Sequence, residues 1–547
     1  MSPSTEHIII APVLIPFFAG AIMLLYDERR RRAKLVLSLA STLAMLGVGI
    51  ALLNRADGGL FPGHSNVGYY LLGDWSVPWG IVLVLDRASA MMLVLTGLLA
   101  VPALVYAAAG WARQGQHFLS LFQFLLMGLN GAFLTGDLFS LFVFFEVLLA
   151  ASYGLLLHGG GQLRVRAGLH YVAINLAASL LFLIGAALVY GVTGTLNMAH
   201  LAEMVPRVAA SDRALLHAGA AALGLAFLVK AGIWPLSFWL PTAYMAAPAP
   251  VAAMFAIMTK VGVYILMRLS LLLFGAGAGA SAGFGAPVLI AGGMATMAFG
   301  ILGTLSAQGL GRMAAHLVLV SSGTLIAITG FALTGGGAAM LSGALYYLVS
   351  STLACGALFL LIEPMGREEG GIAAMLALTA EAYGAEPSDD DMPPQEGGLT
   401  LPGTMTILGV SFAFTAVVLS GLPPLSGFIG KFAVLGSAIG TGGTATGLVW
   451  LFVALMILSG FATLIGLMRI GIQTFWATEG SGPRILALEL APIAVLVGMT
   501  LLLTTEAQDT LRYMRATARV LQTPALYVEG VFAAPRVADQ PEAGDGS

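Results

Sequence analysis

The chain has 547 residues, of which 58% are hydrophobic and only 9% are charged. A soluble domain carries about 25% charged residues, so a water-soluble fold is excluded and we predict an all-α, polytopic membrane protein. The net charge of −3 is uninformative, because the positions of the charges matter more than their sum. The single cysteine, Cys355, excludes an internal disulfide and a thiol-rich metal site.

Runs of about 20 apolar residues mark helices that are long enough to cross a bilayer. The first run is followed by a basic block and not by a cleavage site, so we expect it to remain as a membrane helix. The 70 glycines favour close packing between the helices. The predicted segments, about fourteen in all, lie near residues 8–25, 34–54, 80–108, 117–135, 137–157, 168–191, 215–240, 245–272, 287–306, 312–333, 338–362, 404–436, 447–470 and 485–504.

The basic loops predict the orientation of the chain in the membrane. The loop DERRRRAK, residues 27–34, is strongly basic and should be cytoplasmic. Counting segments from there puts the loop at residues 158–166 and the loop that holds Arg312 on the same side. Because the three loops agree, we expect the N-terminus to lie outside the cell.

Two polar regions are expected beyond the spanning segments. The loop at residues 363–402 is acidic and should be a cytoplasmic linker. The region after residue 506 begins with an amphipathic stretch, LRYMRATARVLQ at residues 511–522, and ends in a polar tail. Neither region is expected to cross the membrane.

One short motif occurs in two similar copies inside the apolar segments. WPLSFW at residues 234–239 resembles PPLSGF at residues 423–428, and each motif has a lysine nearby, Lys230 and Lys431. Proline removes a backbone donor, and a broken helix at membrane depth is tolerated only where it lines protein or water. An odd number of segments separates the copies, so the second would be inserted upside down. Inverted repeats with interrupted helices indicate a transporter core.

Few charged residues fall inside the spanning segments, where each costs about 2.5–3.5 kcal/mol. Glu146 lies too deep to reach either surface, and Lys230 is its expected partner. Burial disfavours the charged form of both groups while each charge stabilises the other, so a small movement can switch such a pair. The alternative is a static salt bridge that fixes helix packing.

Lys260 and Lys431 are the other lysines deep in apolar segments. Lys260 has no acidic residue close in sequence, and a buried lysine that can lose its proton is suited to carry one. The alternative is that Lys260 snorkels to a headgroup, although Arg268, two turns further on, is the better candidate. The break before Lys431 predicts water around its side chain, and the alternative is a proline kink with an incidental lysine.

A minority of polar residues lies between the charged ones. His316, Ser350, Ser351 and Thr352 are candidates to pass protons between the lysines through water, or alternatively to hydrogen-bond neighbouring helices only. Asp137 starts an apolar segment, so we expect it to cap that helix, with a functional role as the alternative.

Some functions are excluded because their motifs are absent. No GxxxxGK[ST] loop is present, so ATP hydrolysis is not the driving force. No CxxC or paired-histidine pattern indicates haem or an iron–sulfur centre, and we expect no cofactor and no metal site.

Four motifs together resemble a known protein family. The four motifs are LFVFFEVLLAASYGLLLHGG around Glu146, FLVKAGIWPLSFWLP around Lys230, MTKVGVYILMRL around Lys260 and SGLPPLSGFIGKF around Lys431. Their order and spacing, across residues 80–475, resemble the antiporter-like subunits of respiratory complex I, of related hydrogenases and of Mrp-type cation/proton antiporters. TGDLFSLFVFFE and YGVTGTLNMAHLAE are most similar to the D-type subunits of the Mrp (Mnh/Pha) group of multisubunit monovalent cation/proton antiporters.

The resemblance implies a fold of fourteen helices with two inverted five-helix repeats. These are helices 4–8 and helices 9–13, with helices 7 and 12 broken. The implied divisions are an N-terminal three-helix segment at residues 1–115, a first repeat at 116–275, a second repeat at 286–475, and a last helix with a polar tail at 476–547.

The resemblance also implies roles in proton translocation. Some relatives carry a histidine near the position of Ser350, so the middle of the relay would depend more on water or on His316 here. The family's site residues correspond to the coupled pair Glu146 and Lys230, the central relay Lys260 and the terminal proton site Lys431.

The expected function is proton translocation within a multisubunit Na⁺(K⁺)/H⁺ antiporter that exports cations and maintains pH. The family implies a complex with subunits of A, B, C, E, F and G type in the bacterial inner membrane. The chain would then be part of a secondary transporter and not an enzyme. The alternative is a proton-pumping membrane subunit of a complex I-like or hydrogenase electron-transfer complex.

Overall fold

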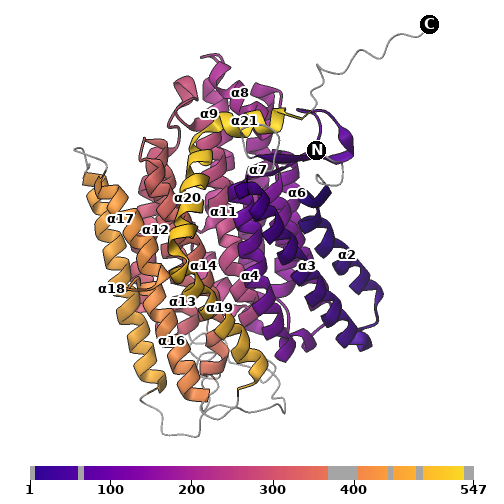
Figure 1. The fold of residues 1–547 in the computed structure, drawn as a ribbon, viewed down its shortest axis with the longest axis vertical. Helices are drawn as coiled ribbons and strands as arrows, with labels where there is room; N and C mark the ends of the chain where they lie inside the picture. Colours follow the sequence, from indigo (N-terminus) through magenta and orange to yellow (C-terminus); the bar gives the residue numbers. More distant parts are fainter. Residues whose placement is uncertain (1–6, 59–66, 367–403, 441–446, 476–484, 535–547) are drawn as a thin grey trace.

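The chain forms a bundle of long helices in the computed structural model, which describes residues 7–58, 67–366, 404–440, 447–475 and 485–534. Figure 1 shows α2 and α3 at one edge of the bundle and α16 to α18 at the other, with α11 and α14 between them. The helices are α2 (Ala11–Leu25), α3 (Arg31–Gly58), α4 (Arg87–Ala109), α5 (Phe118–Leu134), α6 (Leu138–Leu156), α7 (Gln162–Thr193), α8 (Met198–Met204), α9 (Arg213–Ala231), α10 (Trp239–Ala246), α11 (Ala249–Phe274), α12 (Ala286–Ser306), α13 (Leu310–Leu333), α14 (Ala338–Gly366), α16 (Thr404–Ser420), α17 (Ser426–Gly440), α18 (Gly447–Phe475), α19 (Ala487–Thr505), α20 (Ala507–Gln522) and α21 (Pro524–Phe532).

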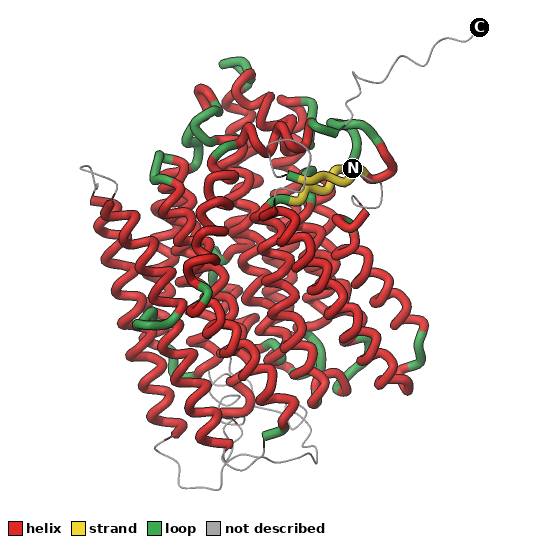
Figure 2. The backbone as a smooth tube through the Cα atoms, viewed as in Figure 1, coloured by secondary structure: helices red, strands yellow, loops and turns green. Residues whose placement is uncertain are grey.

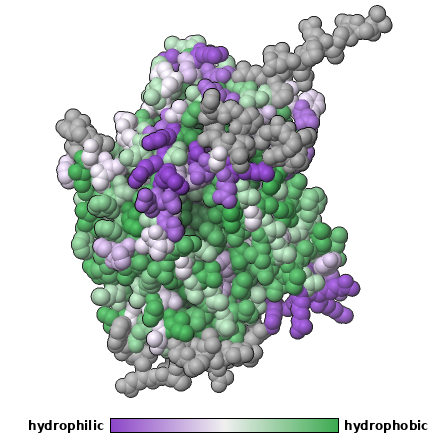
Figure 3. All heavy atoms as spheres, in the orientation of Figure 1, coloured by the Kyte–Doolittle hydropathy of each residue, from purple (hydrophilic) through white to green (hydrophobic). Residues whose placement is uncertain are grey.

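The helices confirm the prediction of a polytopic membrane protein. Within the described residues, 11 helices are long and apolar enough to cross a membrane. Apolar residues also cover most of the face drawn in Figure 3, whereas hydrophilic residues gather over α20 and at the turn between α2 and α3. An apolar outer surface of this extent suits lipid, because lipid does not penalise exposed hydrocarbon.

The core of the bundle lies along α11, α13 and α14, whose residues are nearly all buried. These three helices pack against one another and are surrounded by the rest of the bundle. A helix enclosed in this way carries apolar side chains on every face, so its sequence shows no polar stripe. The polar side chains that such a helix does contain must therefore find partners inside the protein.

Glycines allow α12 and α13 to pack in backbone contact, as the glycine content predicts. A Cβ atom at Gly293 would lie 2.5 Å from the backbone nitrogen of Ala327. A Cβ atom at Gly323 would lie 2.7 Å from the carbonyl oxygen of Gly293. Neither contact is sterically allowed, so any larger residue at these positions would force the two helices apart.

Both predicted helix interruptions are present. One apolar segment is divided into α9 and α10 by residues 232–238, and another into α16 and α17 by residues 421–425. Each break begins at a glycine with left-handed backbone, Gly232 with φ of 77° and Gly421 with φ of 78°. Glycine accepts this conformation because it has no Cβ, so each break is encoded by a glycine followed by proline.

The prediction that the third membrane segment starts near residue 80 is wrong. Val82–Leu85 form strand β2, which pairs antiparallel with β1 (Gly68–Leu71), and α4 begins only at Arg87. The hairpin is yellow in Figure 2. A short apolar run can be a strand or a helix, and here the choice depends on a partner strand that local pattern does not reveal.

The remaining differences concern the polar regions. Residues 363–366 of the predicted acidic loop extend α14, and the rest of that loop lies outside the described residues. Glu363 accepts hydrogen bonds at 2.9 Å from the Ala249 backbone N–H and from the Trp111 indole, so it joins the end of α14 to the start of α11. The amphipathic stretch is confirmed as α20, which packs against α14.

The glycine contact between α12 and α13 leads to a stability prediction. Gly293→Ala should lower the free energy of unfolding by about 1–3 kcal/mol, because the added methyl group overpacks a backbone contact. The measurement is the thermal unfolding midpoint of the purified protein in detergent.

The matched control is Gly224→Ala in the middle of α9, where an added Cβ meets nothing within 4 Å. That change should be neutral or slightly stabilising, since alanine favours a helix over glycine by about 0.5–1 kcal/mol. Equal midpoints for the two variants would contradict the packing argument.

Candidate functional site

Lys230 lies in the last turn of α9, immediately before the first break. Its side chain is only 6% exposed, and its Nζ atom has no hydrogen-bond partner among the described residues. The ammonium instead lies 5.0 Å from the centre of the Phe145 ring. A buried cation held only by an aromatic face is poorly compensated, so a neighbouring charge has a strong influence on it.

Glu146 follows Phe145 in α6 and is half-buried. It accepts a hydrogen bond from Ser179 Oγ of α7 and acts electrostatically on Lys230. The two charged groups are therefore neighbours without a hydrogen bond from the ammonium to the carboxylate. A charge interaction through space changes with small displacements, which suits the switchable pair that the sequence predicts.

Lys260 lies in the middle of α11 and is buried, with 2% of its surface exposed. Its Nζ atom donates hydrogen bonds to Ser321 Oγ at 2.8 Å and to Ser322 Oγ at 3.3 Å, both on α13. These contacts hold the side chain inside the bundle, so Lys260 does not snorkel to a headgroup. Hydroxyl groups both donate and accept protons, so they can pass a proton onward.

The hydroxyl chain continues from Lys260 toward α14. Ser321 Oγ and Ser351 Oγ are 2.9 Å apart, and both residues line a cavity of about 10 Å³. Lys431 lines the same cavity from α17. A polar cavity of this size has room for about one water molecule. The described structure therefore places a space for one water molecule between Lys431 on one side and Ser321 and Ser351, the serines connected to Lys260, on the other.

Lys431 follows the second break and bridges back across it. Its Nζ atom donates to the carbonyl oxygens of Ser420 at 2.9 Å and Leu419 at 3.4 Å, at the C-terminal end of α16. The end of a helix leaves carbonyls unsatisfied and carries partial negative charge, so it stabilises an ammonium. The break before Lys431 thus exposes the acceptors that hold this lysine.

The other predicted relay residues differ in whether they reach this row of hydroxyl groups and its cavity. Ser350 lines the cavity, and its Oγ is 2.9 Å from Ser426 Oγ at the start of α17. Thr352 donates to the Leu348 carbonyl of its own helix. The ring of His316 packs against Phe299 of α12, and its Nδ1 atom has no hydrogen-bond partner in the described part of the chain. The structure brings Ser350, but not His316, to the cavity.

Asp137 confirms its predicted role as a helix cap. Its carboxylate accepts hydrogen bonds from the backbone N–H groups of Phe139 at 2.8 Å and Ser140 at 2.9 Å, at the start of α6. Burial raises the pKa of the Asp137 carboxyl, and these two hydrogen bonds oppose that shift.

The prediction that Arg268 snorkels is wrong. Arg268 is 6% exposed, and its Nη2 atom donates to Asp86 Oδ1 at 2.8 Å and to the Tyr264 hydroxyl at 2.9 Å. Asp86 caps α4 by accepting from the Ser89 backbone N–H. Asp86 and Arg268 are 182 positions apart, so nothing local in the sequence pairs them.

No metal site is assembled within the residues that the structure describes, where no group of three or more His, Cys, Asp or Glu side chains is placed to hold an ion. The groups that the fold does bring together around the lysines include hydroxyls, one carboxylate and backbone carbonyls. Amines, hydroxyls and carboxylates are groups that bind or pass protons.

Comparison with known proteins identifies the family. The model of the NADH:quinone oxidoreductase/Mrp antiporter transmembrane family matches residues 135–462, a range that holds all four charged residues of the site. The chain belongs to this family.

Family members resemble the chain over nearly its whole length. A probable K⁺/H⁺ antiporter D subunit from Rhizobium meliloti is 52% identical and covers 99% of this chain and 100% of its own length. A Na⁺/H⁺ antiporter D subunit from Alkalihalophilus pseudofirmus is 33% identical over 96% of this chain and 99% of its own length. A chain of the Mrp complex from Dietzia sp. matches with a TM-score of 0.79 at 26% identity, covering 97% of this chain and 100% of that one.

The buried pair between Asp86 and Arg268 leads to a second stability prediction. Asp86→Asn should lower the free energy of unfolding by about 3–5 kcal/mol, because it leaves a buried guanidinium without its counter-charge. Thermal unfolding of the purified protein measures the effect.

Asp57→Asn is the matched control, because Asp57 pairs with Arg87 at 3.2 Å but its side chain is 45% exposed. Water screens this pair, so its loss should cost about 1 kcal/mol or less. If Asp57→Asn destabilises the protein as much as Asp86→Asn, burial does not set the strength of the two pairs.

Proposed function

We propose that this chain is the proton-translocating subunit of a multisubunit Na⁺(K⁺)/H⁺ antiporter. The observation that carries the proposal is the row of proton-binding groups from Lys260 through Ser321 and Ser351 to the cavity beside Lys431. Relatives named as antiporter D subunits match the chain at full length, which supports an antiporter over an electron-transfer complex.

Proton transfer along this row needs no group from outside the chain except water. The Lys260 ammonium gives a proton to Ser321 Oγ, and Ser321 gives its own hydroxyl proton to Ser351 Oγ. Ser351 passes a proton to water in the cavity, and that water gives a proton to Lys431 when Lys431 is in its neutral amine form. Each hydroxyl gains one proton and loses one, so the net change is a neutral amine at Lys260 and an ammonium at Lys431.

The Glu146–Lys230 pair is proposed to control this transfer. Lys230 Nζ has no hydrogen-bond partner among the described residues, so its charge depends on the distance to the Glu146 carboxylate. The close approach of α9 to α11 links the pair to Lys260, since a Cβ at Gly262 would lie 3.0 Å from the Ala231 backbone nitrogen. A change in the charge of Lys230 therefore alters the electrostatic potential at α11, the helix that holds Lys260.

The membrane helices are also proposed to follow the arrangement that the family implies. Fourteen spanning helices would contain two inverted five-helix repeats, at residues 116–275 and 286–475, between an N-terminal segment at 1–115 and a final helix and tail at 476–547. The two breaks support this arrangement, since each is a glycine with left-handed backbone between two half-helices. In an inverted repeat the two breaks open toward opposite membrane faces, as alternating access requires.

The chain is proposed to act inside a larger complex in the bacterial inner membrane, with A, B, C, E, F and G type subunits. Support comes from the match to a chain of the Mrp complex. By the positive-inside rule, the basic turn between α2 and α3 would lie in the cytoplasm and the N-terminus outside.

Substitution of Lys260 separates a proton carrier from a structural cation. Lys260→Arg keeps a positive charge and hydrogen-bond donors, but arginine does not release its proton, so transport should stop while the complex still assembles. Lys260→Ala, Lys431→Ala, Lys230→Ala and Glu146→Ala should also abolish transport. The assay is the Na⁺- or K⁺-induced collapse of a pH gradient in everted vesicles that contain the whole complex.

The control for this series is Arg512→Ala, which removes a cation whose side chain is 73% exposed on α20 and should leave exchange unchanged. Co-purification of the other antiporter subunits shows that each variant assembles. Full exchange by Lys260→Arg would rule out proton release at Lys260, and co-purifying iron–sulfur subunits would favour the electron-transfer alternative.

The serine row gives a sharper test, because two neighbouring serines contact Lys260 differently. Ser321→Ala removes the hydroxyl that connects Lys260 to Ser351, so the initial exchange rate should fall about tenfold if the transition state loses about 1.4 kcal/mol. Ser322→Ala removes the longer, 3.3 Å contact, which does not reach Ser351 in the described structure, so its effect should be smaller. Equal rates for the two variants would argue against transfer through Ser321.

A further inference from the structure

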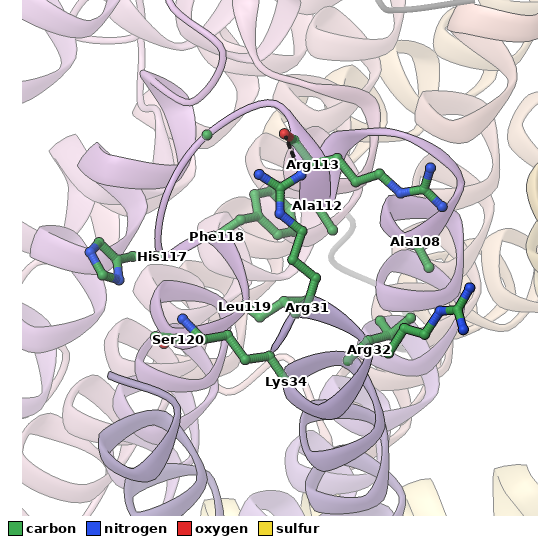
Figure 4. A pocket seen from close by; sticks show the side chains of 12 residues that line it. Arg31, Arg32, Lys34, Ala108, Ala112, Arg113, His117, Phe118, Leu119 and Ser120 are labelled. Atoms are coloured by element: carbon green, nitrogen blue, oxygen red, sulfur yellow. Dashed lines mark hydrogen bonds between the residues drawn. The ribbon is translucent and has the colours of Figure 1, made fainter. Parts of the chain in front are cut away.

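A second polar feature lies far from the lysine row, at the basic turn between α2 and α3. A cavity of about 80 Å³ opens there between the start of α3, the end of α4 with the short 3₁₀ turn η4 (Trp111–Arg113), and the start of α5 (Figure 4). We call it the basic pocket. It is lined by Arg31, Arg32, Lys34, Leu35, Ala108, Ala112, Arg113, Gly115, His117, Phe118, Leu119 and Ser120.

Four cationic side chains line the basic pocket. Arg31, Arg32, Lys34 and Arg113 line it, and no acidic residue is among the lining residues that the structure describes. Arg31 Nη1 donates to the backbone carbonyl of Arg113 at 3.2 Å, which fixes the Arg31 guanidinium at the pocket (Figure 4). Several cationic groups that line one space favour an anion there.

Ser120 is an independent sign of a ligand. Its side chain is 1% exposed, and its Oγ atom has no hydrogen-bond partner among the described residues, although it lines the pocket. A buried hydroxyl without a partner costs free energy unless something binds it. Ser120 also lies in the first turn of α5, where no side chain caps the backbone N–H groups. Uncapped helix starts bind phosphate-like anions.

The position and walls of the pocket decide what kind of anion fits. The pocket lies at the ends of membrane helices, beside the hydrophilic residues at the lower right of the apolar surface in Figure 3. Leu35, Ala108, Ala112 and Leu119 give it apolar walls next to the cations. A headgroup phosphate with attached hydrocarbon suits both parts, whereas free phosphate would use only the cations. Basic pockets between membrane helices are the usual sites of anionic headgroups.

We propose that the basic pocket binds the phosphate of an anionic phospholipid headgroup, held by Arg31, Arg32, Lys34 and Arg113 and by the Ser120 hydroxyl. The acyl chains lie along the apolar surface beside the pocket. The site is separate from the row of Lys260, Ser321, Ser351 and Lys431, so it does not carry protons. The bound lipid fixes the N-terminal helices in the bilayer.

The experiment compares lipids on the purified full-length chain. Dioleoylphosphatidylglycerol should raise the thermal unfolding midpoint more than dioleoylphosphatidylcholine, and native mass spectrometry should show it retained. Arg32→Ala with Arg113→Ala should weaken retention by about fivefold for each charge removed. Ser120→Leu should abolish the retention of phosphatidylglycerol, because leucine fills the cavity while every charge remains.

The matched control is Arg29→Ala with Arg30→Ala, which removes two exposed arginines of the same turn that do not line the pocket. This variant should retain phosphatidylglycerol as the parent protein does. Ser120→Leu also keeps the test decisive if the double arginine variant fails to fold.

Two results would overturn the proposal. One is that the pocket variants and the control variant lose phosphatidylglycerol equally, which would mean that general surface charge attracts the lipid. The other is that inorganic phosphate alone produces the whole stabilisation, which would assign the pocket to a free anion.

Discussion

The structure depends on one constraint: inside a membrane protein, a charge or a free backbone group is costly unless the protein itself or enclosed water satisfies it. Lys431 meets this constraint at the carbonyls that the break between α16 and α17 leaves free. Lys260 meets it at hydroxyl groups of α13. The second helix break and Lys431 are therefore parts of the same arrangement, because this break supplies the acceptors that stabilise the buried ammonium.

The bundle contains two kinds of buried charge, and their partners differ. Arg268 has a carboxylate partner in Asp86, lies near the ring of Tyr527 on α21, and links α4 to α11. A guanidinium that is always charged and fully paired favours a fixed structure. The buried lysines contact hydroxyls, carbonyls or an aromatic face instead. Lys230 is also influenced by the Glu146 carboxylate, but without a hydrogen bond to it. Neutral contacts tolerate both the charged and the uncharged amine, which is the property that a proton carrier needs.

Much of the fold was predictable from the sequence because lipid imposes a simple pattern. The apolar runs became helices almost throughout, and the glycine–proline breaks at Gly232 and Gly421 appeared where they were expected. Errors arose where a distant partner decided the outcome. Val82–Leu85 became a strand because β1 pairs with it, and Arg268 stayed buried because Asp86 reaches it. The contacts Ser321–Ser351 and Ser350–Ser426 likewise could not be predicted, since nothing in the local sequence indicates which helices face each other.

The sequence by itself determined that the chain is a membrane protein, that Lys230, Lys260 and Lys431 are buried, and where two helices break. It did so because burying a charge in lipid is costly and proline cannot continue a helix, and both facts are local. Only the tertiary structure decided what each charge contacts. It placed Lys230 over Phe145 and Lys260 against two serines, and left a water-sized cavity beside Lys431. These contacts join residues far apart in the chain, so they depend on how the helices pack.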